Sequence, residues 1–80
     1  MKSGPTGKAA VPDLVHLLED REAGVRAAAG LALGAMGKEA RAALPQLTEM
    51  LKDDSEAVRQ AAAAALKKID PAAAAKMDLP

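Results

Sequence analysis

Residues 25–37 read VRAAAGLALGAMG, and this stretch decides the fold that the sequence predicts. It returns thirty-three positions later as VRQAAAAALKKID, residues 58–70. Both copies begin with Val-Arg, continue in alanine and carry an aliphatic residue near the end, Met36 or Ile69. Alanine has the highest intrinsic helix propensity, so each copy predicts a helix. A fixed offset between two such segments predicts a tandem repeat.

The same offset relates the residues that precede each copy. The matched pairs share residue type and spacing: Val11 and Leu44, Pro12 and Pro45, Leu14 and Leu47, Asp20 and Asp53. Within each copy the apolar residues recur at three- and four-residue steps, which is the helical period. The pattern therefore predicts four helices, over about 9–19, 23–36, 39–52 and 56–69. Asp70-Pro71 then starts a further helix, because Asp is a favoured N-cap and Pro a favoured first helical residue.

The repeats set the expected domain organisation. We expect one domain, residues 1–80, with a first repeat over about 5–37, a second over about 38–70 and a partial third unit over 71–80. Pro12 and Pro45 leave two alternatives for the first helix of each repeat. Either the helix begins near Ala9 or Ala42, so that the proline lies in the first turn, or a helical lead-in is kinked at the proline. We expect residues 1–6 and 77–80 to be poorly ordered.

Composition limits the classes of function. The chain has 11 basic and 11 acidic residues, a formal net charge of zero, whereas nucleic-acid binding normally goes with a basic excess. It has no cysteine, which excludes disulfides and thiolate metal sites. His16, the single histidine, falls opposite the apolar stripe of Leu14 and Leu18, where a solvated side chain is expected. We expect no catalytic residue, no cofactor and no metal. Neither a membrane span nor a signal-peptide core is present, so we expect a soluble cytoplasmic protein.

These residues resemble HEAT repeats, in the variant related to the phycobilisome-lyase HEAT-like repeats. The shared features are a proline in the first helix, an aspartate at its end, and Val-Arg early in the second helix. In this chain they are Pro12 and Pro45, Asp20 and Asp53, Val25-Arg26 and Val58-Arg59. The resemblance covers about residues 7–70 and implies an all-α fold. That fold is an α-solenoid of two HEAT-like αα-hairpins plus the start of a truncated third repeat. The resemblance also implies a hydrogen-bonded ladder between repeats, formed by Asp20, Arg26, Asp53 and Arg59.

The resemblance favours a non-catalytic protein–protein interaction or scaffold module. Its candidate interaction surface lies on the second helices, which would line the concave side: Arg26, Ala27, Gly30, Gly34, Arg59, Gln60, Ala63 and Lys67. Gly30 and Gly34 lie four residues apart and would allow the backbone of a partner to approach closely. The partner is a protein that the sequence does not identify. Apolar surface at Leu31, at Val15 and at the repeat ends, which another copy could cover, predicts self-association as a homodimer formed by end stacking or by hairpin exchange.

Two alternatives stay open. In the first alternative, the chain is a fragment or an engineered minimal array of a larger HEAT-repeat protein and has no independent function. Otherwise it binds nucleic acid weakly through a mildly basic concave face, formed by Arg26, Arg59, Lys67 and Lys68. The zero net charge and the absence of aromatic residues argue against nucleic acid, because base stacking has no platform on this chain.

Overall fold

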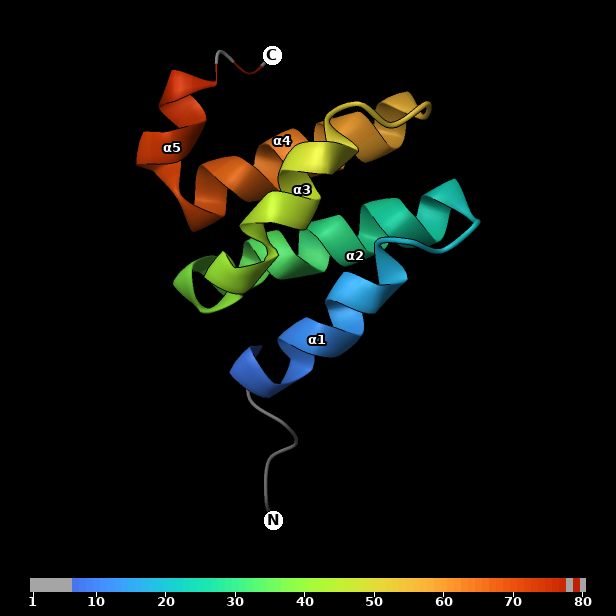
Figure 1. Ribbon diagram of the computed structural model, residues 1–80, viewed down its shortest axis with the longest axis horizontal. Helices are drawn as coiled ribbons and strands as arrows, with labels where there is room; N and C mark the ends of the chain where they lie inside the picture. Colours follow the sequence, from blue (N-terminus) through green and yellow to red (C-terminus); the bar gives the residue numbers. More distant parts are fainter. Residues whose placement is uncertain (1–6, 78, 80) are drawn as a thin grey trace.

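The computed structural model describes residues 7–77 and 79, with side chains from Ala10 onward. These residues form helices and turns without a strand. The helices are α1 (Gly7–Leu17), α2 (Ala23–Met36), the 3₁₀-helix η1 (Gly37–Ala43), α3 (Leu44–Met50), α4 (Glu56–Ile69) and α5 (Pro71–Lys76). In Figure 1, α2 and α4 cross the middle of the stack, with α1 at one end and α5 at the other. The all-α fold of stacked αα-hairpins predicted from the sequence is confirmed.

The second helix of each hairpin has the predicted bounds, 23–36 and 56–69. Ser55 caps α4, because its Oγ accepts a hydrogen bond from Val58 N at 3.4 Å. Glu22, in the equivalent place before α2, makes no side-chain cap bond. Gly37 follows α2 with φ at 62°, a conformation that favours glycine, and so ends the helix. Local sequence signals therefore set the start of α4 and the end of α2.

The first helices differ from the prediction and from each other. In the first repeat, α1 covers 7–17 and contains Pro12 in its interior. In the second repeat, the single helix expected over 39–52 is divided into η1 and α3, with a non-helical residue at Ala40 (φ −97°, ψ 17°). Pro45 lies in the first turn of α3 and has no N–H to donate to the preceding turn. The 3₁₀-helix η1 precedes this first turn, so the chain does not need the α-helical hydrogen bond that a backbone N–H at position 45 would donate.

A sixth helical segment, α5, begins as predicted. Asp70 is its N-cap, and its Oδ1 accepts a hydrogen bond from Ala73 N at 3.1 Å, while Pro71 opens the first turn. Ala74 is buried against the rest of the core. Met77 and Leu79 are also partly buried against it, contrary to the expectation that 77–80 is poorly ordered. The same expectation for residues 1–6, 78 and 80 lies outside the described residues.

The core lies between the two hairpins. Its largest fully buried side chains are Leu33 on α2, Leu47 on α3, and Val58 and Leu66 on α4. Seven residues of α4 are buried but only four of α2, because α4 has α2, α3, η1 and α5 around it. The first hairpin is consequently the less covered half of the molecule.

At Gly34 the two repeats approach each other closely. A Cβ atom added to Gly34 would lie 2.8 Å from the Cα and 3.1 Å from the Cβ of Ala65 on α4. A Cβ added to Gly30 would lie 3.6 Å from the Cβ of Ala61, an ordinary contact. Both glycines are buried between α2 and α4. This corrects the expectation that they offer an open approach to a partner, because the second repeat of the same chain already occupies that approach.

Among the described residues, no helix combines the length and the apolar character that crossing a membrane requires.

The two glycines differ in what a methyl group would meet, and this gives a matched pair of variants. Gly34→Ala should lower the free energy of unfolding by about 1 kcal/mol or more, because overpacking costs about 1–3 kcal/mol and outweighs the gain in helix propensity. Gly30→Ala should be neutral or should raise stability by up to about 1 kcal/mol, since only the propensity term remains. Urea denaturation followed by circular dichroism measures both. A Gly34→Ala variant as stable as Gly30→Ala would contradict the close contact.

Candidate interaction surface

A bidentate ion pair joins the two repeats. Arg26, in the first turns of α2, donates from Nε to Asp53 Oδ2 at 3.0 Å and from Nη2 to Asp53 Oδ1 at 3.0 Å. Asp53 lies in the turn between α3 and α4. The two side chains keep only 18% and 15% of their surface exposed. This planar, two-bond geometry fixes orientation as well as distance, which a lysine would not do.

The same two residues also hold the turns on which they lie. Arg26 donates from Nη1 to the carbonyl oxygens of Asp20 at 2.8 Å and Arg21 at 3.0 Å, in the turn between α1 and α2. Asp53 Oδ1 accepts a hydrogen bond from Ser55 N at 2.9 Å, in the turn between α3 and α4. One guanidinium and one carboxylate therefore connect two turns that are separated by a whole repeat.

Arg59 and Asp20 each reproduce one half of this arrangement. Arg59 donates from Nη1 to the carbonyl oxygens of Asp53 at 2.7 Å and Asp54 at 3.1 Å. Asp20 Oδ1 accepts from Glu22 N at 2.8 Å. Within the part of the chain that the structure describes, neither side chain forms an ion pair with another side chain. Of the four residues expected to form a ladder, Arg26 and Asp53 form a side-chain ion pair, and the two arginines also donate to the backbone carbonyls of Asp20 and Asp53.

The ion pair shifts the titration of both its members. The hydrogen bonds from Arg26, and then the one from the Ser55 N–H, hold the pKa of the Asp53 carboxyl below its usual value. The hydrogen bonds to Asp53 raise the pKa of Arg26 further above its usual value. Both shifts favour the charged forms that the pair requires.

The candidate interaction surface is only partly open. Gln60 and Lys67 are exposed, and Ala27, Arg26 and Arg59 are half-buried. Ala63 is buried, with 5% of its surface exposed, like the two glycines discussed above. The accessible part of this surface is thus smaller than the sequence suggested.

A shallow groove between α2 and α4 contains an exposed leucine that the sequence analysis did not include in this surface. Its lining is mostly small and apolar: Ala27, Leu31, Ala57, Gln60, Ala61 and Ala64. Leu31 is 53% exposed, the highest value among the large hydrophobic side chains of the described residues. Comparison of the two repeats in the sequence singles out Leu31, because the equivalent position in the second copy is Ala64. Leu31 is therefore a large apolar side chain at a position that the second repeat fills with alanine.

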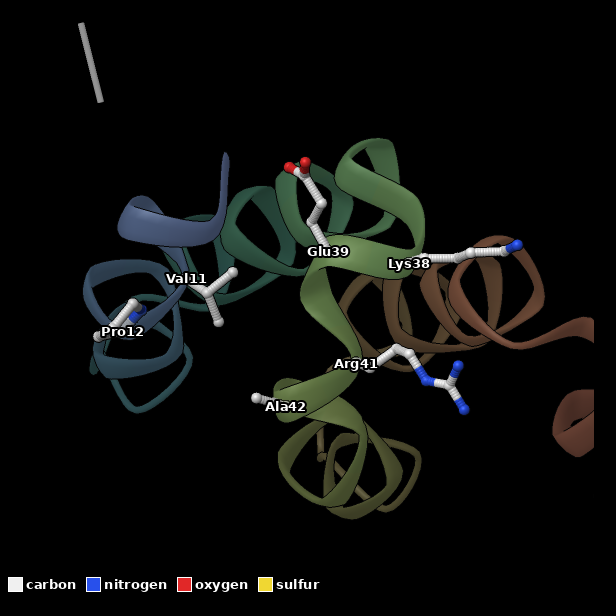
Figure 2. A pocket seen from close by; sticks show the side chains of 6 residues that line it. All are labelled: Val11, Pro12, Lys38, Glu39, Arg41 and Ala42. Atoms are coloured by element: carbon white, nitrogen blue, oxygen red, sulfur yellow. The ribbon is translucent and has the colours of Figure 1, made fainter. Parts of the chain in front are cut away.

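A larger depression of about 530 Å³ lies between α1 and η1. Figure 2 shows Val11, Pro12 and Ala42 around its apolar part, whereas Lys38 and Arg41 extend away from Val11 and Pro12. The charged groups therefore do not converge on a common point, as they would in a site for an anion or a polar substrate. The described residues also contain no group of three or more His, Cys, Asp or Glu side chains placed to hold a metal ion.

The basic face is weaker than its composition suggests. Arg26 and Arg59 both direct Nη1 to backbone carbonyls in the turns, and Arg26 uses its remaining donors on Asp53. Donors used inside the fold do not neutralise phosphate groups, and phosphate neutralisation supplies most of the affinity for nucleic acid. The structure therefore gives the nucleic-acid alternative no added support.

Comparison with known proteins gives one match. A family model described as HEAT repeats matches residues 4–67, which is most of the chain. No curated protein matches, and neither does any solved structure. The phycobilisome-lyase variant of the family stays a prediction.

Asp53 and Asp20 provide a matched pair for testing the ion pair. Asn in either place keeps an oxygen that can accept from Glu22 N or Ser55 N, so the local turn bond is retained while the charge is lost. We expect Asp53→Asn to lower the urea midpoint near neutral pH clearly more than Asp20→Asn, because only Asp53 binds an arginine side chain.

The pH dependence follows from the lowered pKa of Asp53. Because that pKa is lower in the folded than in the unfolded chain, the pair stabilises the fold above the unfolded value, and this contribution is lost as the pH falls through the folded value. The difference in urea midpoint between wild type and Asp53→Asn should therefore be largest at about pH 7 and should shrink towards about pH 2. A difference that is independent of pH would contradict this assignment.

Proposed function

Because this chain belongs to the HEAT-repeat family, we propose that it is a non-catalytic protein-interaction or scaffold module that also binds copies of itself. Proteins of this family generally mediate protein–protein interaction or scaffolding and are typically non-catalytic. The partner contacts the groove between α2 and α4, and the self-association uses the ends of the repeat stack. A cytoplasmic location, expected from the sequence, stays a prediction.

The observation that carries the proposal is the exposure of Leu31 in a groove otherwise formed by alanine. A leucine that is 53% exposed leaves apolar surface in water, and covering it is favourable by about 25 cal/mol per Å². The alanines around it present no long side chain that would block the approach of a partner. Gln60, at the edge of the groove, offers an amide that can both donate and accept hydrogen bonds. This combination fits a protein segment that inserts one or two apolar side chains and hydrogen-bonds at the rim.

The end of the stack formed by the first hairpin supports self-association. Leu17, on the last turn of α1, is 39% exposed, whereas its repeat equivalent Met50 is only 6% exposed. Met50 is covered because it faces the preceding repeat, where its Cε lies 3.6 Å from the position of a Cβ on Gly30. Leu17 presents the same kind of side chain to solvent. A second copy covers it as a homodimer, either by end stacking or by exchange of a hairpin.

Leu31 and Leu17 separate the two interactions experimentally. A photo-crosslinking residue in place of Gln60 should trap a protein partner in cells, and adding Leu31→Asp should abolish the crosslink while Leu17→Asp leaves it intact. Leu31→Asp should abolish the crosslink because partner binding would then bury an unpaired carboxylate in the groove. The free-energy cost of that burial exceeds what the leucine contributes to binding. A crosslink that survives Leu31→Asp would remove the groove from the proposal.

Self-association is measured by sedimentation equilibrium of the wild-type chain over a wide concentration range. We expect reversible self-association, with the dimer as its first step, at high micromolar concentration. Leu17→Asp should weaken it about tenfold or more, corresponding to about 1.4 kcal/mol, and Leu31→Asp should leave it unchanged. A wild-type chain that remains monomeric throughout, with a cooperative thermal transition, would contradict self-association but not partner binding at the groove.

A titration with labelled duplex DNA at low salt tests the nucleic-acid alternative. Because Arg26 is bound to Asp53 and the chain has a formal net charge of zero, we expect no change in fluorescence anisotropy. A salt-dependent rise that is lost in Lys68→Glu would revive that alternative.

A further inference from the structure

Arg59 is oriented as Arg26 is, but no side chain among the described residues binds its outer edge. In both residues Nη1 donates to two carbonyls of the preceding turn, at 2.8 and 3.0 Å for Arg26 and at 2.7 and 3.1 Å for Arg59. In Arg26 the remaining edge, Nε and Nη2, holds the carboxylate of Asp53. The corresponding edge of Arg59 makes no hydrogen bond to any described residue. A preorganised guanidinium fork is thus presented at the end of the stack formed by the second hairpin.

Asp20 presents the complementary group at the opposite end. Its Oδ1 accepts the N–H two residues later at 2.8 Å, as Asp53 Oδ1 does at 2.9 Å. In Asp53 the two carboxylate oxygens also receive the guanidinium of the preceding repeat. No described arginine or lysine side chain binds Asp20 in that way. Its carboxylate is therefore held in the conformation that the bidentate pair uses.

The face of the first repeat that is equivalent to the internal contact is apolar and only partly covered. In the second repeat, four residues face the glycines of α2, with exposures of 0%, 6%, 4% and 1%: Leu47, Met50, Ala61 and Ala65. Their equivalents, thirty-three positions earlier, are Leu14, Leu17, Ala28 and Ala32. Leu17 and Ala28 are exposed, and Leu14 and Ala32 are half-buried. The end of the first hairpin thus has the same apolar and charged pattern that binds a preceding repeat within the chain.

We propose that copies of this 80-residue chain associate head to tail, with Arg59 of one copy bound bidentately to Asp20 of the next. The proposal rests on the self-association proposed above and names its contact. The occupant is a second copy because the two ends are complementary in charge and each reproduces one side of the contact inside the chain. Asp20 lies in the turn between α1 and α2, and Arg59 lies near the start of α4. Figure 1 shows α1 at one end of the stack and α5, which follows α4, at the other.

This contact differs in symmetry from a closed dimer. It joins two different surfaces, so a pair of copies still has one free head and one free tail. Association therefore continues beyond the dimer as concentration rises, unless the geometry closes a ring. A two-fold dimer would instead stop at two copies.

Two features of the tail make the contact between copies weaker than the contact within the chain. Lys67 stands where the first repeat has Gly34, whose missing side chain allows the 2.8 Å approach to Ala65. In addition, α5 occupies, relative to α4, the place that η1 occupies relative to α2. Residues 73–76 of one copy and residues 7–10 of the next copy would therefore occupy the same space, because both are equivalent to residues 40–43. One of these terminal turns must give way when copies stack, and helix ends open at little cost.

Exchanging the charges tests the contact directly. Asp20→Arg and Arg59→Asp should each weaken self-association about tenfold or more, because each places like charges opposite one another. Mixing the two variants in equal amounts should restore association, since every head then meets a tail of opposite charge. Charge-matched controls on η1, Glu39→Arg and Arg41→Asp, change the net charge equally but lie away from both ends and should leave association unchanged.

Sedimentation equilibrium measures the association, and far-UV circular dichroism checks that every variant is folded. Lys67→Gly provides an independent test and should tighten self-association severalfold, because it restores the close approach that Gly34 permits. If the wild type associates but the charge variants associate equally well, alone and mixed, the head-to-tail contact is wrong while self-association stands. If the wild type does not associate at any concentration, both are wrong.

Discussion

The contact between α2 and α4 is the constraint on which the rest of the structure depends. A chain of this size without aromatic residues buries little apolar area per side chain. Its core therefore depends on close packing of small side chains. Density comes from the absence of a side chain at Gly34, which brings the backbones of the two helices together. That approach places Leu33 and Leu66 in full burial and surrounds α4 with neighbours on several sides.

The Arg26–Asp53 ion pair sets the relative orientation of the hairpins at one edge of this contact. Alanine-lined helix surfaces are smooth, and dispersion alone specifies their rotation weakly. A bidentate pair that is also hydrogen-bonded to both turns gives one preferred arrangement. The energy of such a partly exposed pair is modest, so its main contribution is specificity of geometry. The unpaired copies of the same groups, Asp20 and Arg59, make the ends of the stack directional.

Two apolar surfaces of the described residues remain exposed because the first hairpin is less enclosed than the second: the groove at Leu31 and the end of the first hairpin at Leu17. On the open side of the α2–α4 layer, Leu31 stands in a groove of alanines, and at the end of the first hairpin Leu17 lacks the cover that Met50 has. A module built of repeats uses the same chemistry for internal stacking and for external binding. Partner binding and self-association are therefore separate properties of different faces, and single substitutions can remove one without the other.

The amino-acid sequence by itself determined the helices and the repeat. Helix propensity, the Ser55 cap, the turn at Gly37 and the Asp70-Pro71 start act within a few residues, so α2, α4 and α5 begin where local chemistry requires. The thirty-three-residue offset identified which residues are equivalent, including the four charged residues of the ladder. Only the tertiary structure decided which equivalents behave differently. Gly34 became an internal contact and Leu31 remained exposed, because each outcome depends on what the other repeat brings into contact. Equivalent positions have the same local chemistry but different neighbours, and neighbours from distant parts of the chain are set by packing.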